Sequence, residues 1–215
     1  MAHAVNALSR VAHNPGIKHW EALCQVLRYL NHTKDFALVY KKQRRQAPVV
    51  NGYSDSDWAP NYGNQYRNYK STTGNITNVD GNAVHWRSKR QDRTAYSVNE
   101  AEYYAGAECA KDIIWIDRLA QSLSTDQTLH NKPIMYMDSA TAKQCAENPS
   151  DNVKQRHIDL RAHALRESVQ RGDFSIHHID GKENPADQLT KPLGDTTFRK
   201  HREFHRMLPR TSKIP

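Results

Sequence analysis

The sequence predicts an α/β fold in which a five-stranded mixed sheet carries helices on both faces, preceded by a short helical segment. Two observations lead to this expectation. Three strand-like segments follow one another at residues 49–55, 71–79 and 82–87, and from residue 98 onward helical and strand-like segments alternate. A run of strands followed by helix–strand alternation indicates a mixed sheet with helices on its faces.

Residues 2–31 predict two helices, which the stop-and-turn signal Asn14-Pro15-Gly16 separates. The second carries an apolar stripe at helical spacing, made of Trp20, Leu23, Val26, Leu27 and Leu30. A short strand is expected at 36–40. The basic stretch that follows ends at Pro48 and is typical of a linker. We therefore expect a helical segment at 1–48, an α/β domain at 49–208 and a loose tail at 209–215.

Within the second segment, Asp80-Gly81 provides the turn of a tight hairpin between 71–79 and 82–87. The capping box Ser97-Val98-Asn99-Glu100 starts a helix at about residue 98. Its predicted buried face is Ala101, Ala105, Cys109, Ile113, Ile116, Ala120 and Leu123.

The remaining elements follow in alternation. Strands are expected at 133–138 and 174–179, and helices at 140–147 and from 158 to Gly172. Asn184-Pro185 begins a further helix, with Asn as its cap and Pro at its first position, and Gly194 ends it. A basic helix is expected at 196–207.

Composition narrows the class of partner. Lys and Arg total 31 against 23 Asp and Glu, so the net charge is +8 and the pI is near 9.4. This excess favours a polyanionic partner, nucleic acid above all, although a generic basic surface remains an alternative.

The three cysteines are far apart, which excludes a disulfide framework. No apolar run approaches about 18 residues and no signal peptide is evident, so we expect no membrane partner and an intracellular location, cytoplasmic or nuclear.

Four carboxylates lie where strands end or helices begin: Asp55, Glu102, Asp138 and Asp187. If the fold is as predicted, the first and fourth strands of the sheet lie side by side. Asp55 and Asp138 then converge at one edge, where sites in α/β proteins form. Carboxylate oxygens are the ligands that Mg²⁺ prefers, and paired divalent ions catalyse phosphodiester hydrolysis. The alternative is that these are ordinary surface acids.

Seven segments stand out along the chain. They are Gly52-Tyr53-Ser54-Asp55-Ser56-Asp57-Trp58-Ala59, Lys70-Ser71-Thr72-Thr73-Gly74, Trp86-Arg87-Ser88-Lys89-Arg90-Gln91, Asn99-Glu100-Ala101-Glu102-Tyr103, Met137-Asp138-Ser139-Ala140, Arg156-His157-Ile158-Asp159-Leu160-Arg161 and Asn184-Pro185-Ala186-Asp187-Gln188-Leu189-Thr190-Lys191-Pro192-Leu193. In their residues, order and spacing, these segments resemble the ribonuclease H domain of copia-type LTR retrotransposons. Residues 2–42 resemble the end of the preceding reverse transcriptase of the Pol polyprotein, through Asn6-Ala7-Leu8-Ser9-Arg10, Asn14-Pro15-Gly16 and Leu27-Arg28-Tyr29-Leu30.

The resemblance implies an RNase H-like fold and an endonuclease that hydrolyses the RNA strand of RNA–DNA hybrids. It places the catalytic, metal-binding carboxylates on Asp55, Glu102, Asp138 and Asp187, which would hold two Mg²⁺ or Mn²⁺ ions. A reverse transcriptase polymerase domain is the expected protein partner, and a virus-like particle is a further expected location if the full element is active.

Six basic residues around the hairpin are candidate contacts to the phosphates of the hybrid: Arg67, Lys70, Arg87, Lys89, Arg90 and Arg93. Each of these six could equally be solvated surface charge. Trp86, which lies between them in the sequence, could be a core residue. A hybrid is recognised by its shape and its 2′-hydroxyls, so no sequence specificity is expected.

Two residues are candidate accessories. Asp57 is two residues from Asp55 and shares its strand face, so it could support a metal through water or simply begin a turn. His178 could act near the site, or point away from a strand.

The alternative function is a catalytically silent or domesticated nucleic-acid-binding fragment. An integrase-type nuclease is disfavoured because the acids run Asp, Glu, Asp, Asp.

Overall fold

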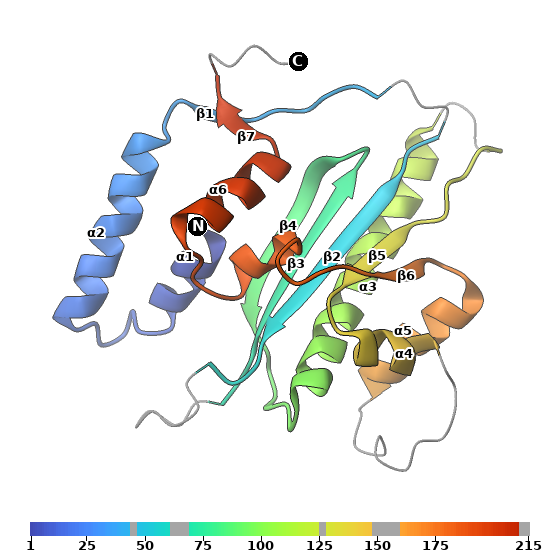
Figure 1. Cartoon of the computed structure of the whole chain (residues 1–215), viewed down its shortest axis with the longest axis horizontal. Coiled ribbons are helices and arrows are strands. Elements are labelled where there is room, and N and C mark those ends of the chain that lie inside the picture. The colour runs from blue at the N-terminus through green and yellow to red at the C-terminus, as the bar shows by residue number, and fades with distance from the viewer. Residues whose placement is uncertain (44–46, 61–68, 125–127, 148–159, 211–215) are drawn as a thin grey trace.

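The computed structural model describes residues 1–43, 47–60, 69–124, 128–147 and 160–210 (Figure 1). Its main sheet has the strand order β4-β3-β2-β5-β6. The strands are β2 (Val50–Asp57), β3 (Thr72–Val79), β4 (Asn82–Arg90), β5 (Ile134–Met137) and β6 (Ser175–His178). The pairs β2–β3 and β3–β4 are antiparallel, while β2–β5 and β5–β6 are parallel. The predicted five-stranded mixed sheet is confirmed.

One face of the sheet packs against α3 (Val98–Leu123), α4 (Ala140–Glu147) and α5 (Leu160–Arg171). The predicted cap is present, since Ser97 Oγ accepts a hydrogen bond from the Glu100 amide. Most of the predicted stripe is buried, but Leu123 is 76% exposed and that part of the prediction is wrong.

The opposite face is covered by α1 (Ala2–Ser9), the short 3₁₀ helix η2 (Pro185–Leu189) and α6 (Asp195–Phe204). Alternation along β2 separates the two faces. Gly52 faces α3, whereas the neighbouring Tyr53 packs edge-to-face on Phe204 of α6. Helices on both faces are thus confirmed. The helix expected from Asn184 to Gly194 is limited to η2, which Asn184 caps by accepting from the Ala186 amide.

A second, two-stranded sheet was not predicted. In it, β1 (Phe36–Leu38) pairs antiparallel with β7 (Met207–Pro209). The basic helix therefore ends at Phe204 rather than Met207, and Arg206 has a positive φ of 55° that turns the chain into β7. Because of this pairing, the expected segment 1–48 lies directly against the end of the α/β domain.

The helix α2 (Ile17–His32) lies at the periphery and has no buried residue (Figure 1). Its predicted apolar stripe is present but largely exposed, with Trp20 64% exposed and Leu27 53% exposed. Trp86 on the edge strand β4 is also 53% exposed, so it is not a core residue. Across the described ranges, no helix has both the length and the apolar character needed to cross a membrane.

Candidate metal centre

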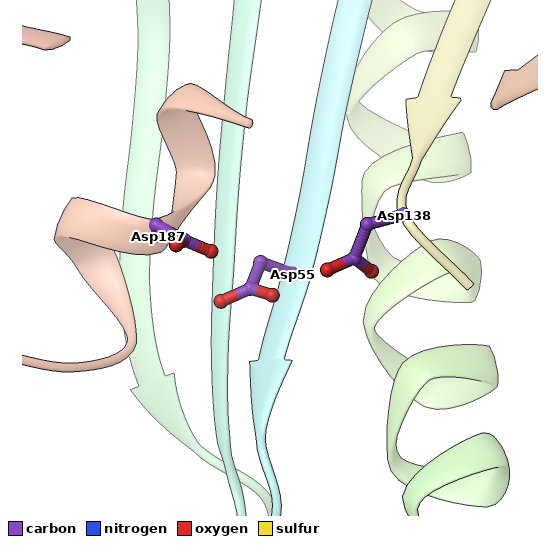
Figure 2. A group of neighbouring side chains, drawn as sticks. All are labelled: Asp55, Asp138 and Asp187. Atoms are coloured by element: carbon purple, nitrogen blue, oxygen red, sulfur yellow. The ribbon is translucent and has the colours of Figure 1, made fainter. Parts of the chain in front are cut away.

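Three predicted carboxylates converge in the structure. Asp55, Asp138 and Asp187 each offer an oxygen, and these oxygens lie within 4.8 Å of one another. Figure 2 shows Asp55 on β2 between Asp138, which follows β5, and Asp187 on η2. Parallel pairing of β2 with β5 brings Asp55 and Asp138 together. Ser54 is in register with Met137, and the two aspartates directly follow these residues. The predicted adjacency of these strands is confirmed.

Asp187 reaches the cluster because η2 packs directly on the sheet at Gly74. Gly74 is the β3 partner of Asp55, and a Cβ at this position would lie 2.7 Å from Thr190 Cγ2 and 2.9 Å from the Ala186 carbonyl oxygen. Real Cβ atoms do not approach so closely, so only glycine admits η2 at this distance. Gly74 therefore determines the position of the third carboxylate.

Two further side chains attach η2 to β2. The Asn184 side-chain amide donates to the Ser54 carbonyl at 2.9 Å, and the Thr190 hydroxyl donates to Asp55 Oδ2. Asn184 and Thr190 are both fully buried. The bond from Thr190 orients Asp55 toward the cluster. Because both donor side chains are buried, the positions of the site carboxylates depend on packing in the protein core.

Glu102, the fourth predicted carboxylate, lies beside the cluster with its head turned to β2. Its Oε1 accepts from both the amide and the hydroxyl of Ser56, at 3.1 and 2.7 Å. Within the described ranges it is not one of the three converging carboxylates, and its buried Oε2 has no hydrogen-bond partner there. Oε2 is thus available as a ligand while Oε1 stays bound to Ser56.

The electrostatics of the cluster favour a cation. Burial, followed by repulsion from Asp55, raises the pKa of Asp187 to about 7 and raises the pKa of Asp138 above its ordinary value. Burial, then Asp55 and Asp138, raises the pKa of Glu102 well above its ordinary value. Each shift reflects negative charge that water no longer screens and that a bound divalent ion would neutralise. The residues present therefore fit a divalent metal site.

A lysine that was not predicted as a site residue lies beside the carboxylate cluster. Lys191 Nζ lies 3.0 Å from Asp187 Oδ1. Burial disfavours its charged form, but the carboxylates of Asp55, Asp187 and Asp138 outweigh burial and raise the pKa of Lys191. The available signal was its spacing, since a lysine four residues after an acid lies on the same side of a helical turn.

The two accessory candidates both lie near the cluster. Asp57 is half-buried, and burial, with a smaller contribution from Asp55, raises its pKa against the opposing charge of Lys191. His178 is the exposed last residue of β6, in register with Met137, and its charge lowers the pKa of Asp138. A role for either residue stays a prediction.

Four of the predicted basic residues gather in one place. Arg87, Lys89, Arg90 and Arg93 line a cavity of about 210 Å³ between β4 and α3, together with Lys111 and Tyr104, which the sequence analysis did not select. Within this group Arg87 is internally neutralised, with Glu108 at 3.3 Å and Asp112 at 3.2 Å. Its role is therefore at least partly structural.

The other two basic candidates differ. Lys70 donates to the Asp92 carbonyl at 2.6 Å and is thereby attached to the loop after β4, while Lys89 on β4 lies 3.7 Å from the Asp92 carboxylate. Arg67 falls outside the described residues.

Comparison with known proteins places this chain among transposon proteins. It is 38% identical over 199 residues to the retrovirus-related Pol polyprotein of transposon TNT 1-94 from Nicotiana tabacum, covering 92% of the chain and 14% of that relative. It is 35% identical to that of transposon RE2 from Arabidopsis thaliana, over 92% of the chain and 13% of the relative. The chain thus spans a small part of these proteins.

A shorter relative also matches. The Secreted RxLR effector protein 161 of Plasmopara viticola is 38% identical over 116 residues, which is 54% of the chain and 78% of that protein. A search of protein-family models finds no match.

Solved structures similar to this chain include RNase H1 from Halobacterium salinarum, with a TM-score of 0.45 and 18% identity over 66% of the chain and 94% of that protein. Another is LC11-RNase H1 in complex with RNA/DNA hybrid, with a TM-score of 0.42 and 16% identity over 66% and 93%. On the strength of its sequence relatives, the chain belongs to the retrovirus-related Pol polyproteins of transposons, of which it corresponds to one segment.

Proposed function

We propose that this chain is a metal-dependent endonuclease that hydrolyses the RNA strand of RNA–DNA hybrids, as part of the reverse transcriptase of a copia-type element. The observation that carries the proposal is the convergence of Asp55, Asp138 and Asp187, with oxygens within 4.8 Å of one another. Glu102 lies beside these residues, and its buried Oε2 has no hydrogen-bond partner within the described residues, which supports the proposal.

Asp55, Asp138 and Asp187 would hold divalent ions, Mg²⁺ or Mn²⁺, and Glu102 would add its Oε2. When bound, a pair of such ions supplies an activated water and stabilises charge on the leaving 3′-oxygen, so that the products carry a 5′-phosphate and a 3′-hydroxyl. The chain itself contributes position: the Thr190 hydroxyl orients Asp55, and Ser56 orients Glu102.

The cavity between β4 and α3 is the proposed contact to the phosphate backbone. Lys89 and Arg93 would neutralise phosphates there, which predicts salt-sensitive binding without sequence preference. The half-buried ion pairs of Arg87 with Glu108 and Asp112 would fix the strand that presents these residues.

We further propose that residues 1–48 are the end of a reverse transcriptase, that 49–208 form the nuclease domain, and that a polymerase domain is the protein partner. Family membership supports this, because the matched relatives are Pol polyproteins far longer than the chain. The apolar groove of about 740 Å³ along α1 and α2, which includes the exposed Trp20, is compatible with such a partner.

A second candidate function is a domesticated fragment that binds nucleic acid without cutting it. The observation favouring it is the similarity to a protein named as a secreted effector, which covers 78% of that protein. The two functions differ in cleavage: the nuclease cuts the RNA of a hybrid with a divalent ion, whereas the domesticated fragment binds the hybrid without cutting it. Ions bound only by the folded state raise the melting temperature, which tests the metal site itself.

The test is cleavage of an RNA–DNA hybrid labelled on the RNA strand, at low salt with Mn²⁺. We expect cleavage of RNA in the hybrid but not in duplex RNA, loss of cleavage with a chelator, and loss in Asp138→Asn. The control Asp195→Asn alters an exposed carboxylate paired with Arg199 and should cleave normally. Unchanged cleavage by Asp138→Asn would refute the proposal, and hybrid binding without cleavage would favour the domesticated fragment.

A further inference from the structure

Lys191 is held against the carboxylate cluster by the local fold. Thr190 ends η2, and the Lys191 amide donates to the Asp187 carbonyl at 3.2 Å. This bond fixes the backbone of Lys191 one turn after Asp187, so its side chain runs alongside the carboxylate and Nζ reaches Oδ1 at 3.0 Å. The contact is therefore set by the same turn that delivers Asp187 to the site.

The ammonium lies beside more than one carboxylate. Lys191 contacts Asp187, which offers an oxygen within 4.8 Å of oxygens of Asp55 and Asp138. Buried carboxylates this close together need a compensating cation. In the arrangement described here, Lys191 supplies that positive charge.

We propose that Lys191 is the resident counter-ion of the carboxylate cluster and competes with divalent ions for Asp187. The inference rests on the proposed metal-dependent function. Lys191 stabilises the ion-free cluster, and its charge repels an incoming divalent ion at the Oδ1 that it contacts. Its side chain is 39% exposed, and its four-carbon stem is flexible, so the ammonium has room to withdraw toward solvent. Lys191 is thus a positioning residue that sets metal affinity through Asp187.

The experiment measures Mn²⁺ binding by calorimetry, and the melting temperature with and without Mn²⁺, on the full chain without nucleic acid. Lys191→Met should lower the melting temperature of the ion-free protein and tighten the Mn²⁺ dissociation constant roughly tenfold. Lys191→Arg, which keeps the charge, should stay close to the wild type. The control Lys111→Met removes a lysine that pairs with the single carboxylate of Glu108 at 2.6 Å, and it should leave Mn²⁺ affinity unchanged.

Unchanged or weaker Mn²⁺ binding by Lys191→Met would overturn the inference. If the wild type binds Mn²⁺, Asp138→Asn abolishes binding and Lys191→Met binds normally, the counter-ion role alone fails and the metal site stands. If the wild type does not bind Mn²⁺, both fail together. Tighter binding in Lys191→Met with normal binding in Lys111→Met supports the inference.

Discussion

Gly74→Ala tests whether the close packing of η2 on β3 builds the metal site. The added Cβ would lie 2.7 Å from Thr190 Cγ2, 2.8 Å from Leu189 Cβ and 2.9 Å from the Ala186 carbonyl oxygen. The last two contacts cannot be relieved by rotating a side chain. The whole of η2 must therefore move away from the sheet, and Asp187 must move with it.

Overpacking of this kind costs about 1–3 kcal/mol of the free energy of unfolding. In addition, displacement of η2 breaks the hydrogen bond from Thr190 to Asp55 and separates the carboxylates. We therefore expect Gly74→Ala to fold with reduced stability, measured by urea unfolding, and to bind Mn²⁺ more weakly than the wild type, measured by calorimetry. Circular dichroism checks that the variant is folded.

Gly52→Ala is the matched control. Gly52 lies on the adjacent strand β2 but faces α3, where its Cβ would lie 2.3 Å from Ile113 Cδ1 and 2.9 Å from Cys109 Sγ. It should lose stability to a similar extent while keeping Mn²⁺ affinity, because its clash is on the other face of the sheet. Wild-type Mn²⁺ affinity in a folded Gly74→Ala protein would show that the close packing of η2 on β3 does not build the metal site.

Three further predictions follow from the site and its surroundings. Thr190→Val removes the hydroxyl that orients Asp55, and urea unfolding should show a loss of about 1 kcal/mol, whereas an unchanged midpoint would contradict the assigned role. Burial, then the charge of His201, lowers the pKa of His205 to about 4. Because protonation then favours the unfolded chain, stability should fall as pH drops from about 6.5 to 4, by up to about 3 kcal/mol, and His205→Phe should flatten that pH profile. Replacing Lys89 and Arg93 by Ala should reduce the salt slope of hybrid binding by about 2, and an unchanged slope would remove them from the interface.

Much of the sheet could be predicted because its signals are local. The Asp80-Gly81 turn sets the hairpin, and the Ser97 cap fixes the start of α3. Helix–strand alternation then predicts that β2 and β5 are neighbours, which is enough to bring Asp55 and Asp138 together. The pairing of β1 with β7 could not be predicted in this way, since both strands have three residues and lie far apart in sequence.

The site beyond the two strand ends depends on packing that the sequence does not encode locally. The rotation of α3 about its axis and the position of Ser56 place Glu102 Oε1 within hydrogen-bonding distance of the Ser56 amide and hydroxyl. The distance between η2 and the sheet decides that Lys191 and Thr190 join the cluster. Both residues stand within a segment that the resemblance singled out, but only the three-dimensional contacts assign them roles.

The most direct test of the account is the initial rate of RNA-strand cleavage in a hybrid with Mn²⁺, compared between the wild type, Asp55→Asn and Asp57→Asn. The two aspartates share one face of β2, but only Asp55 belongs to the converging carboxylates. We expect Asp55→Asn to lose cleavage and Asp57→Asn to retain most of it. Wild-type cleavage by a folded Asp55→Asn protein would contradict the account.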